Sequence, residues 1–400
     1  MNPNTIRKID YWFGQPICTL LTLLKFSSPQ KDKPKKIIFL KFIEQGATVL
    51  AYSALKRAVE LVGRENVYFC VFETNRPILD ILDIIPQKNI YSIKDKSLFQ
   101  FLGSAFSTIL KIRSANIDTA IDMEFFSRAS AIFSFMSGAK IRVGLHRFTS
   151  EYPYRGNLMT HRIQYNPYLH ISEFYFSLVE AALQDPAEVP MMKIPKSSFT
   201  AELAVFTPSE EEKKSVKQKI ESSFSSPFRD GAKIVILNPN ASDLLPLRKW
   251  EKQKFIDLGK KILSENPNAY LAISGAPSEQ ADAEDICKKI GSEKAVSFAG
   301  KTSLRELLVL YSLADVLVTN DSGPGHFSAL TNIRTIILFG PETPKLFGPI
   351  SPNAQVIWKE LACSPCVSVL NHRFSPCNNN VCMQTIQVNE VYEAVKMKLN

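Results

Sequence analysis

The stretch VLVTNDSGPGHFSAL, residues 316–330, contains the strongest indication of fold and site in this sequence. An apolar run with β-branched residues ends at Asp321, turns through a segment with two glycines and a proline, and continues into a helix-like run from His326. A strand that ends in a glycine-rich turn before a helix directs backbone amides and the helix dipole toward a phosphate. The stretch therefore predicts an α/β protein that binds a phosphorylated ligand.

The side chains of this turn suit a sugar attached to a diphosphate. Asp321 is expected to accept hydrogen bonds from sugar hydroxyls, His326 to donate to the diphosphate, and Ser322 to add a hydroxyl donor. Gly323 and Gly325 would let the ligand approach the backbone. The alternative is a helix capped by Asp321 or Ser322, which leaves the histidine and the glycines unexplained. We therefore favour a ligand site.

Further runs rich in β-branched and aromatic residues alternate with stretches of helical period, such as 49–62 and 99–112. The expected strands are residues 37–42, 67–73, 89–93, 119–123, 140–145, 233–240, 269–275, 296–300, 316–321 and 334–340. Strand and helix in alternation predict parallel sheets covered on both faces. We expect an α/β protein with two Rossmann-like parallel-sheet domains.

The expected domains follow from the looser stretch 148–226, which contains tyrosine and proline clusters. We expect an N-terminal membrane-associating segment over 1–30, an acceptor domain over 31–200 and a nucleotide-sugar-binding domain with a cysteine-rich tail over 201–400. Ligands of open α/β sheets bind outside the carboxyl ends of the strands. The two domains are therefore expected to face a cleft.

Two more loops leave the carboxyl ends of expected strands in the second domain. LNPNASDLLPLRKW, residues 237–250, brings Arg248 and Lys249, whose charges would offset a diphosphate without a metal. Taken alone, this loop would be interpreted as a solvated helix start. ISGAPSEQ, residues 273–280, brings Glu279, which would accept the two hydroxyls of a ribose. The agreement of three loops favours a nucleotide-sugar site.

These segments resemble the heptosyltransferase-like glycosyltransferases of family 9. The resemblance is carried by NPNAS with RKW, SGAPSE, FAGKTSLRELLVLYSLADVLVTNDSGPGH and LFGPETPKLFGP. It is strong over 234–350 and weaker over 36–145.

The resemblance implies a GT-B architecture and inverting transfer without a cofactor or catalytic metal. It implies a nucleotide-sugar donor, ADP-heptose in the best-known members, and a lipopolysaccharide or other lipid-linked or cell-surface glycan acceptor. It also implies that Arg248 contacts the donor phosphates and Glu279 the ribose, while the sugar and diphosphate contact Asp321, Ser322, Gly323 and His326.

The sequence departs from this family where the catalytic base is expected. The family's first strand usually ends in Gly-Asp, whereas KFIEQGATVL, residues 41–50, has Ala47 after Gly46. An inverting transfer needs a group that deprotonates the acceptor hydroxyl, and Glu44 is the nearest carboxylate. Asp122, with Glu124 beside it at the end of the strand 119–123, is the second candidate.

The missing aspartate keeps other functions open. One alternative is a catalytically silent nucleotide-sugar-binding partner of an active subunit, and another is a UDP-sugar enzyme of the same fold. Nucleic-acid binding is disfavoured, because the basic residues concentrate at the N-terminus without interleaved aromatic platforms.

The N-terminal segment combines positive charge with apolar residues. Residues 1–41 contain eight basic and two acidic side chains, which is six of the net charge of +9. The apolar run YWFGQPICTLLTLLKF, residues 11–26, is shorter than the roughly 20 residues that a membrane span needs. We expect a peripheral anchor on the inner face of the cytoplasmic membrane. The alternative is an amphipathic helix that packs on the domain.

Four of the seven cysteines lie close together near the C-terminus. They are Cys363, Cys366, Cys377 and Cys382, separated by two, ten and four residues. Two such pairs are typical of a structural zinc site, which is the expectation here. Free thiols and disulfides remain alternatives, although disulfides require an oxidising compartment.

Overall fold

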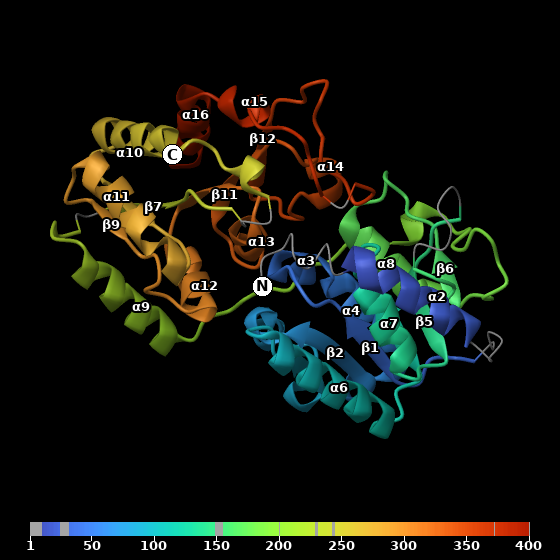
Figure 1. The fold of residues 1–400 in the computed structure, drawn as a ribbon. Helices are drawn as coiled ribbons and strands as arrows, with labels where there is room; N and C mark the ends of the chain where they lie inside the picture. The colour runs from blue at the N-terminus through green and yellow to red at the C-terminus, as the bar shows by residue number, and fades with distance from the viewer. Residues whose placement is uncertain are drawn as a thin grey trace. The chain divides into compact units, whose positions relative to one another are not determined.

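The computed structural model describes residues 10–24, 32–148, 155–199, 201–228, 231–241, 245–371 and 373–399. The chain forms two compact units, Met1–Glu202 and Leu203–Asn400, each built around one parallel six-stranded sheet (Figure 1). The prediction of an α/β protein with two parallel sheets is confirmed.

The sheet of the first unit has the strand order β3-β2-β1-β4-β5-β6, and every pair in it is parallel. Its strands are β1 (Ile37–Leu40), β2 (Val67–Phe72), β3 (Ile90–Ile93), β4 (Thr119–Asp122), β5 (Ile141–Leu145) and β6 (His161–Ile163). The strand order reverses between β1 and β4. Ligands of open α/β sheets bind outside the carboxyl ends of the strands at such a reversal.

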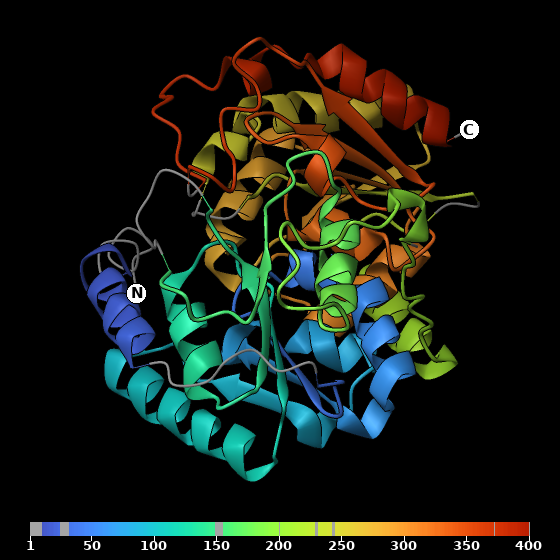
Figure 2. The ribbon, with the colours of Figure 1, turned by 90° about the vertical axis from the view of Figure 1, so that its right-hand side faces the viewer.

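Helices cover both faces of the first sheet. They are α2 (Gln15–Leu23), α3 (Gln45–Leu50), α4 (Tyr52–Val62), α5 (Pro77–Leu82), α6 (Leu98–Ser114), α7 (Arg128–Met136) and α8 (Ile171–Ala181), with a π-helical turn, η1 (Asp10–Gly14), before α2. Helices α6 and α7 pack on one face through a shared core that includes Ile109, Ile112 and Phe133. α2 packs on α7, and α4 packs against α8 (Figures 1 and 2).

The sheet of the second unit has the order β12-β11-β10-β7-β8-β9 and is also parallel throughout. Its strands are β7 (Lys233–Asn238), β8 (Ala269–Ile273), β9 (Ala295–Ser297), β10 (Val316–Asn320), β11 (Arg334–Phe339) and β12 (Ala354–Trp358). Here the strand order reverses between β7 and β10. Two of the loops singled out in the sequence, those after β7 and β10, leave the sheet at this reversal, and the third follows the neighbouring strand β8.

The second unit has its own hydrophobic core and eight α-helices in its described residues. They are α9 (Glu210–Ser223), α10 (Lys252–Glu265), α11 (Gln280–Ile290), α12 (Leu304–Leu313), α13 (Gly323–Ser328), α14 (Pro344–Phe347), α15 (Val381–Gln384) and α16 (Val388–Leu399). Trp250 is 1 % exposed in this core, and its indole N–H donates to the carbonyl of Ile386 over 3.0 Å. The C-terminal helix α16 packs against α10 through the same core.

All ten expected strands are present, each ending within three residues of its expected end. The sequence interpretation missed β6, β12 and α8. β6 and β12 lie at sheet edges, and β12 is only partly buried, so neither has the continuous apolar pattern of a central strand. α8 was missed because it lies inside the stretch interpreted as a connection.

Candidate active site

The carboxyl edge of the second sheet is held together by Asn320, the last residue of β10. Its side chain is fully buried. The amide nitrogen donates to the carbonyls of Pro239 and Asn240 over 2.9 and 3.3 Å, and the amide oxygen accepts from the backbone of Trp250 over 3.0 Å. Because these bonds tie both ends of the loop after β7 to β10, they fix the start of the segment that carries Arg248.

Arg248 lies between two carboxylates at this edge. Its Nε is 3.4 Å from Oδ2 of Asp321, and one terminal nitrogen is 3.1 Å from Oε2 of Glu342. The Arg248 side chain is 16 % exposed, whereas those of Asp321 and Glu342 are 4 % and 2 % exposed. The structure therefore brings together two predicted residues, Arg248 and Asp321, and adds Glu342.

Burial raises the pKa of both carboxyl groups in this cluster. The pKa of Glu342 rises to about 8 because of desolvation, against the lowering effect of Arg248, and the neighbouring Asp321 raises it further. Desolvation also raises the pKa of Asp321, again opposed by Arg248. Near neutral pH Glu342 is therefore protonated and uncharged. Arg248 then keeps more of its positive charge than it would beside two ionised carboxylates.

Sequence reasoning missed Glu342, although the signal that identified the other loops applies to it. Glu342 follows β11, the neighbour of β10, and so leaves the same carboxyl edge of the sheet. One oxygen of its carboxyl group, Oε1, is buried without a hydrogen-bond partner in the described structure. A buried polar atom of this kind suggests a binding function.

The turn after β10 leads directly into the short helix α13. Ser322 occupies the N-cap position but makes no side-chain bond to the helix; its hydroxyl donates instead to the carbonyl of Asn320 over 3.1 Å. His326 lies in α13 and is half-buried. Serine capping, the alternative considered for this turn, is therefore not what the structure shows.

The two glycines of this turn have a packing role that the sequence interpretation did not assign. A Cβ on Gly325 would lie 3.0 Å from Cδ1 of Ile337 in β11, and one on Gly323 would lie 3.1 Å from the ring of Phe327. Gly325 thus lets α13 approach β11 closely, and Gly323 leaves room for the ring of Phe327 within the same helix. Their proposed contact with a ligand stays a prediction.

Glu279 and Lys249 also lie at this edge. Oε2 of Glu279 accepts from the backbone of Ala276 over 2.7 Å, so that part of its carboxylate caps a helical turn. A Cβ on Gly275 would lie 3.0 Å from this oxygen and 3.1 Å from Nδ2 of Asn240, which places Glu279 beside the loop after β7. Lys249 is half-buried next to Arg248. Contacts of either residue with a donor remain predictions.

In the first unit, Glu44 stands at the carboxyl end of β1 with a left-handed backbone, φ 71° and ψ 78°. A residue with a Cβ pays about 1–2 kcal/mol for this conformation. Its Oε2 lies 3.0 Å from Nζ of Lys41, which is fully buried and also 3.1 Å from Oε2 of Glu124. The Glu44 side chain keeps 20 % of its surface exposed, so its carboxylate is both oriented and accessible.

Asp122, the other candidate base, has no exposed side-chain surface. Its carboxylate accepts from the hydroxyl of Ser130 over 2.9 Å, from the backbone of Glu124 over 3.0 Å, and from the guanidinium of Arg155. Burial raises the pKa of this carboxyl, with Arg155 opposing the shift. This environment favours a structural role for Asp122 and makes Glu44 the stronger candidate, while the identity of the base stays a prediction.

The structure does not support the predicted zinc site. Within the described residues, no three cysteine, histidine or acidic side chains lie close enough to hold a metal ion, and all seven cysteines are free. Cys363 and Cys377 are exposed, whereas Cys382 packs over Gly340 in the core. Burial, with a smaller contribution from the other three thiols, raises the pKa of Cys382 to about 11. The four thiols are therefore near enough to influence one another but, in the described structure, are not grouped closely enough to hold a metal ion.

The described part of the N-terminal segment packs on the first unit. Asp10 pairs with Arg128 of α7 over 3.0 Å, Cys18 is fully buried, and a Cβ on Gly14 would lie 2.8 Å from the Arg128 side chain. Searching the described residues reveals no helix with the length and apolarity that crossing a bilayer would need. The alternative of an amphipathic packed helix thus holds for residues 10–24, while 1–9 and 25–30 lie outside the described residues.

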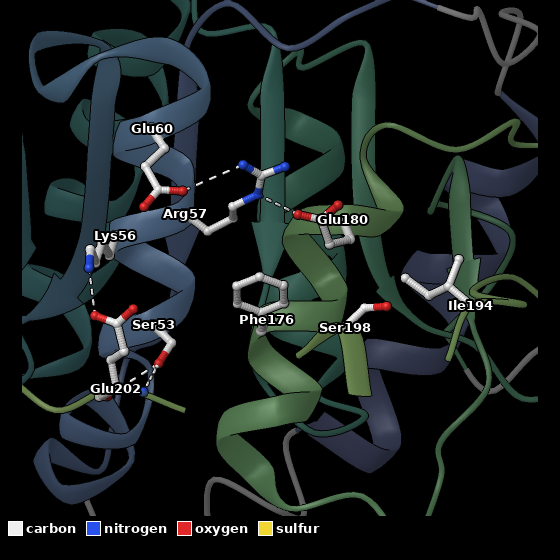
Figure 3. A pocket seen from close by; sticks show the side chains of 9 residues that line it. All are labelled: Ser53, Lys56, Arg57, Glu60, Phe176, Glu180, Ile194, Ser198 and Glu202. Carbon is white, nitrogen blue, oxygen red and sulfur yellow. Dashed lines mark hydrogen bonds and ion pairs between the residues drawn. The ribbon is translucent and has the colours of Figure 1, made fainter. Parts of the chain in front are cut away.

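A hollow of about 310 Å³ between α4 and α8 of the first unit is a separate feature (Figure 3). Its charged groups pair with one another. Arg57 lies 2.5 Å from Glu180 and 3.5 Å from Glu60, and Lys56 lies 2.6 Å from Glu202. Because these charges satisfy each other, the hollow is less suited to an ionic ligand than the edge of the second sheet.

Known structures with a similar fold define the class of this protein. The Escherichia coli ADP-heptose lipopolysaccharide heptosyltransferase II superposes with a TM-score of 0.68 at 18 % identity, over 91 % of this chain and 98 % of that one. The family 9 glycosyltransferase of Veillonella parvula gives 0.68 at 16 %, over 93 % and 99 %. At these identities the similarity shows the fold alone, which is the GT-B fold of the glycosyltransferases.

The particular family follows from the sequence. The model of glycosyltransferase family 9 (heptosyltransferase) matches residues 106–373, and the chain belongs to this family. Lipooligosaccharide heptosyltransferase 2 of Campylobacter jejuni is 30 % identical over 195 residues, 46 % of this chain and 57 % of that protein. Lipopolysaccharide heptosyltransferase 1 of Campylobacter coli is 22 % identical over 74 % of this chain and 80 % of its own. The first of these matches covers little more than half of the relative.

Proposed function

We propose that this protein is an inverting, metal-independent glycosyltransferase that moves heptose or a related sugar from a nucleotide-sugar donor to lipopolysaccharide or another cell-surface glycan. The observation that carries the proposal is the cluster of Arg248, Asp321 and Glu342 at the strand-order reversal of the second sheet. Related proteins named as heptosyltransferases, one of them solved with ADP, support an ADP-heptose donor.

In the proposed reaction, the acceptor hydroxyl attacks the anomeric carbon of the donor sugar. The new glycosidic bond forms as the bond between that carbon and the diphosphate oxygen breaks, and the nucleoside diphosphate leaves with the electron pair. The hydroxyl proton passes to Glu44. Arg248 and His326 stabilise the negative charge that develops on the leaving diphosphate, which gives protein side chains the task that a metal ion performs in other transferases.

Glu342 adjusts this site to a polyanionic ligand. With its pKa raised to about 8, it holds a proton at neutral pH. Arg248 then has a smaller negative charge around it and attracts the diphosphate more strongly. The cluster is thus arranged for an anion that arrives with the donor.

Glu44 is proposed as the base because two independent features mark it. Its backbone is held in a strained conformation, which is common at functional sites, and its ion pair with buried Lys41 fixes the direction of the carboxylate. It takes the place of the aspartate that this sequence lacks at Ala47.

We further propose a peripheral location on the inner face of the cytoplasmic membrane, where a lipid-linked acceptor would be met. The described part of the N-terminal segment supports this proposal, since it exposes several large apolar side chains. They are Tyr11 (59 %), Trp12 (69 %), Phe13 (64 %), Ile17 (41 %), Leu20 (56 %), Leu23 (75 %) and Leu24 (50 %).

The test combines donor binding with turnover. Thermal shifts with ADP-, GDP-, UDP- and CDP-sugars identify the donor, because a ligand at a hundred times its dissociation constant adds about 2.7 kcal/mol of stability. Transfer from ADP-heptose to a truncated lipopolysaccharide core is the expected activity. Binding of a sugar nucleotide without turnover on any acceptor would instead indicate the silent partner, and a preference for UDP-sugars would indicate a UDP-sugar enzyme.

A further inference from the structure

Helix α6 of the first unit exposes a line of large apolar side chains. Leu98, Leu102, Phe106 and Leu110 follow one another at intervals of four residues, and Phe99 lies beside them. Their exposed fractions are 47 %, 55 %, 60 %, 50 % and 88 % in the order Leu98, Leu102, Phe106, Leu110, Phe99. We refer to these five residues as the α6 stripe.

The stripe is not needed to attach α6 to its own sheet. That task falls to Phe101, Ala105, Ile109 and Ile112 on the inner side of the helix, which pack into the core of the first unit. A surface helix usually has polar residues on the side away from the core, so a second apolar flank indicates a binding surface.

Another set of exposed apolar residues lies on the same side of the sheet. α6 and α7 cover one face of the sheet, and η1 with α2 packs on α7 (Figure 2). From η1 and α2, the side chains of Tyr11, Trp12 and Leu23 are 59 %, 69 % and 75 % exposed. Tyrosine and tryptophan are the residues that favour the boundary between lipid and water.

The charges near the α6 stripe indicate which kind of partner it binds. α6 contains no aspartate or glutamate, and neither does α2. Lys94 and Lys96 precede α6, and Lys111 lies in its last turn. These three lysines are exposed and make no ion pair within the part of the chain that the structure describes. The two nearby aspartates already have partners. The carboxylate of Asp95 accepts a hydrogen bond from the hydroxyl of Thr74 over 2.7 Å, and Asp10 forms an ion pair with Arg128.

We propose that the α6 stripe is a second lipid-contacting element, which acts with the exposed side of η1 and α2 to seat the first unit on an anionic membrane. Apolar side chains enter the head-group region, and the flanking lysines meet the lipid phosphates, as on other interfacial helices. The inference deepens the proposed membrane location and rests on it, but it does not depend on the transfer reaction.

The experiment uses the full chain with vesicles of phosphatidylcholine and phosphatidylglycerol at 7:3. The double variant Phe99→Glu/Phe106→Glu changes two exposed positions and should lower the vesicle partition coefficient at least tenfold. A matched control, Tyr168→Glu/Met397→Glu, changes positions that are 87 % and 66 % exposed on other elements and should partition as the unchanged protein does. Circular dichroism and donor binding check that each variant folds.

Two further measurements make the outcomes distinct. Lys96→Ala/Lys111→Ala should reduce the preference for phosphatidylglycerol over pure phosphatidylcholine vesicles. Equal partition of the Phe99→Glu/Phe106→Glu variant and the unchanged protein would overturn the proposal. A second result would also overturn it: sedimentation shows that the unchanged protein is a dimer and the variant a monomer, while both bind vesicles equally. The stripe would then join two copies of the chain. Vesicle binding without any transferase activity would reject the proposed reaction and leave this inference standing.

Discussion

Substituting Arg248 would affect both folding and binding, because Arg248 contacts two buried carboxyl groups and is also expected to bind the donor. Its contacts with Asp321 and Glu342 lie in a largely buried cluster, and removing one partner of a buried ion pair destabilises the fold. Any variant at this position must therefore be assessed for folding as well as for binding.

Replacing Arg248 or His326 by alanine should weaken donor binding, because each change removes a contact to the diphosphate worth about 1.5–3 kcal/mol. Isothermal titration with the donor identified by thermal shift measures the loss. Lys252→Ala is the control, because Lys252 forms exposed ion pairs with Asp282 and Asp285 and should leave donor affinity unchanged. Normal affinity in both site variants would reject the phosphate assignment.

The raised pKa of Glu342 predicts that the stability of the fold decreases as pH rises. Its folded pKa of about 8 lies above the ordinary value near 4.3, so the folded protein holds a proton that the unfolded chain releases between these values. The contribution of Glu342 to the free energy of unfolding is fully present below about pH 4.3. It is lost as pH rises toward 8, by up to about 1.4 kcal/mol per pH unit.

Glu342→Gln should remove this dependence, so that the variant gains stability relative to the parent as pH rises from 5 to 8. Urea unfolding across that range measures the difference. Donor affinity of the parent should also fall above pH 8, where Glu342 ionises, and that of the variant should stay flat. Parallel stability curves for the two proteins would contradict the assignment.

Glu44 and Asp122 should respond differently to loss of their charge. Glu44→Gln keeps the shape of the side chain but removes the base, so turnover should fall about a hundredfold to ten-thousandfold with donor affinity nearly unchanged. Asp122→Asn should lower the melting temperature instead, because it breaks a buried pair with Arg155. Steady-state kinetics and thermal unfolding separate the two effects.

If Glu44→Gln transfers at the normal rate, the base lies elsewhere, and Glu124 is the next residue to test. Activity that appears only after Ala47→Asp, which restores the family residue, would identify the natural protein as a silent sugar-nucleotide binder.

Among the elements, the N-terminal helix combines a buried side with an exposed apolar side. Cys18 and Gly14 pack on α7, so deleting residues 1–30 would uncover part of the first unit's core. Point changes on the exposed side are therefore cleaner than a deletion as a test of membrane binding.

Trp12→Ser/Leu23→Ser should weaken binding to anionic vesicles without affecting donor affinity, because both side chains are more than two-thirds exposed. Vesicle sedimentation provides the measurement. The reverse pattern, normal sedimentation with altered donor binding, would place this helix at the substrate site rather than at the membrane.

At the scale of the whole molecule, all eight predicted donor-binding residues belong to the second unit, Leu203–Asn400. This unit has its own sheet and its own core. A fragment of residues 203–400 should therefore fold and bind the nucleotide donor, with turnover lost because Glu44 is missing. Calorimetry of the fragment tests both expectations, and failure of a well-folded fragment to bind would show that donor affinity needs the first unit.

The sequence by itself determined the two parallel sheets, most strand positions and the three loops that carry the predicted donor-binding residues. Buried parallel strands leave continuous apolar runs, and the polar or glycine-rich turn at each carboxyl end is local in sequence. Arg248, Glu279 and Asp321 could therefore be identified from the strand ends they follow. The edge strands β6 and β12 were not predictable, because β6 has only three residues and the partial burial of β12 leaves no strong apolar pattern.

Only the tertiary structure decided which of these residues meet and how deeply they are buried. The pairing of Arg248 with Glu342, separated by 94 positions in the chain, depends on the positions of β7 and β11 on either side of β10 in the sheet. The same holds for Asp122, whose burial against Arg155 sets it apart from Glu44, and for the four cysteines, which form no metal-holding group within the described residues. Burial and side-chain convergence are properties of long-range packing, which no local pattern encodes.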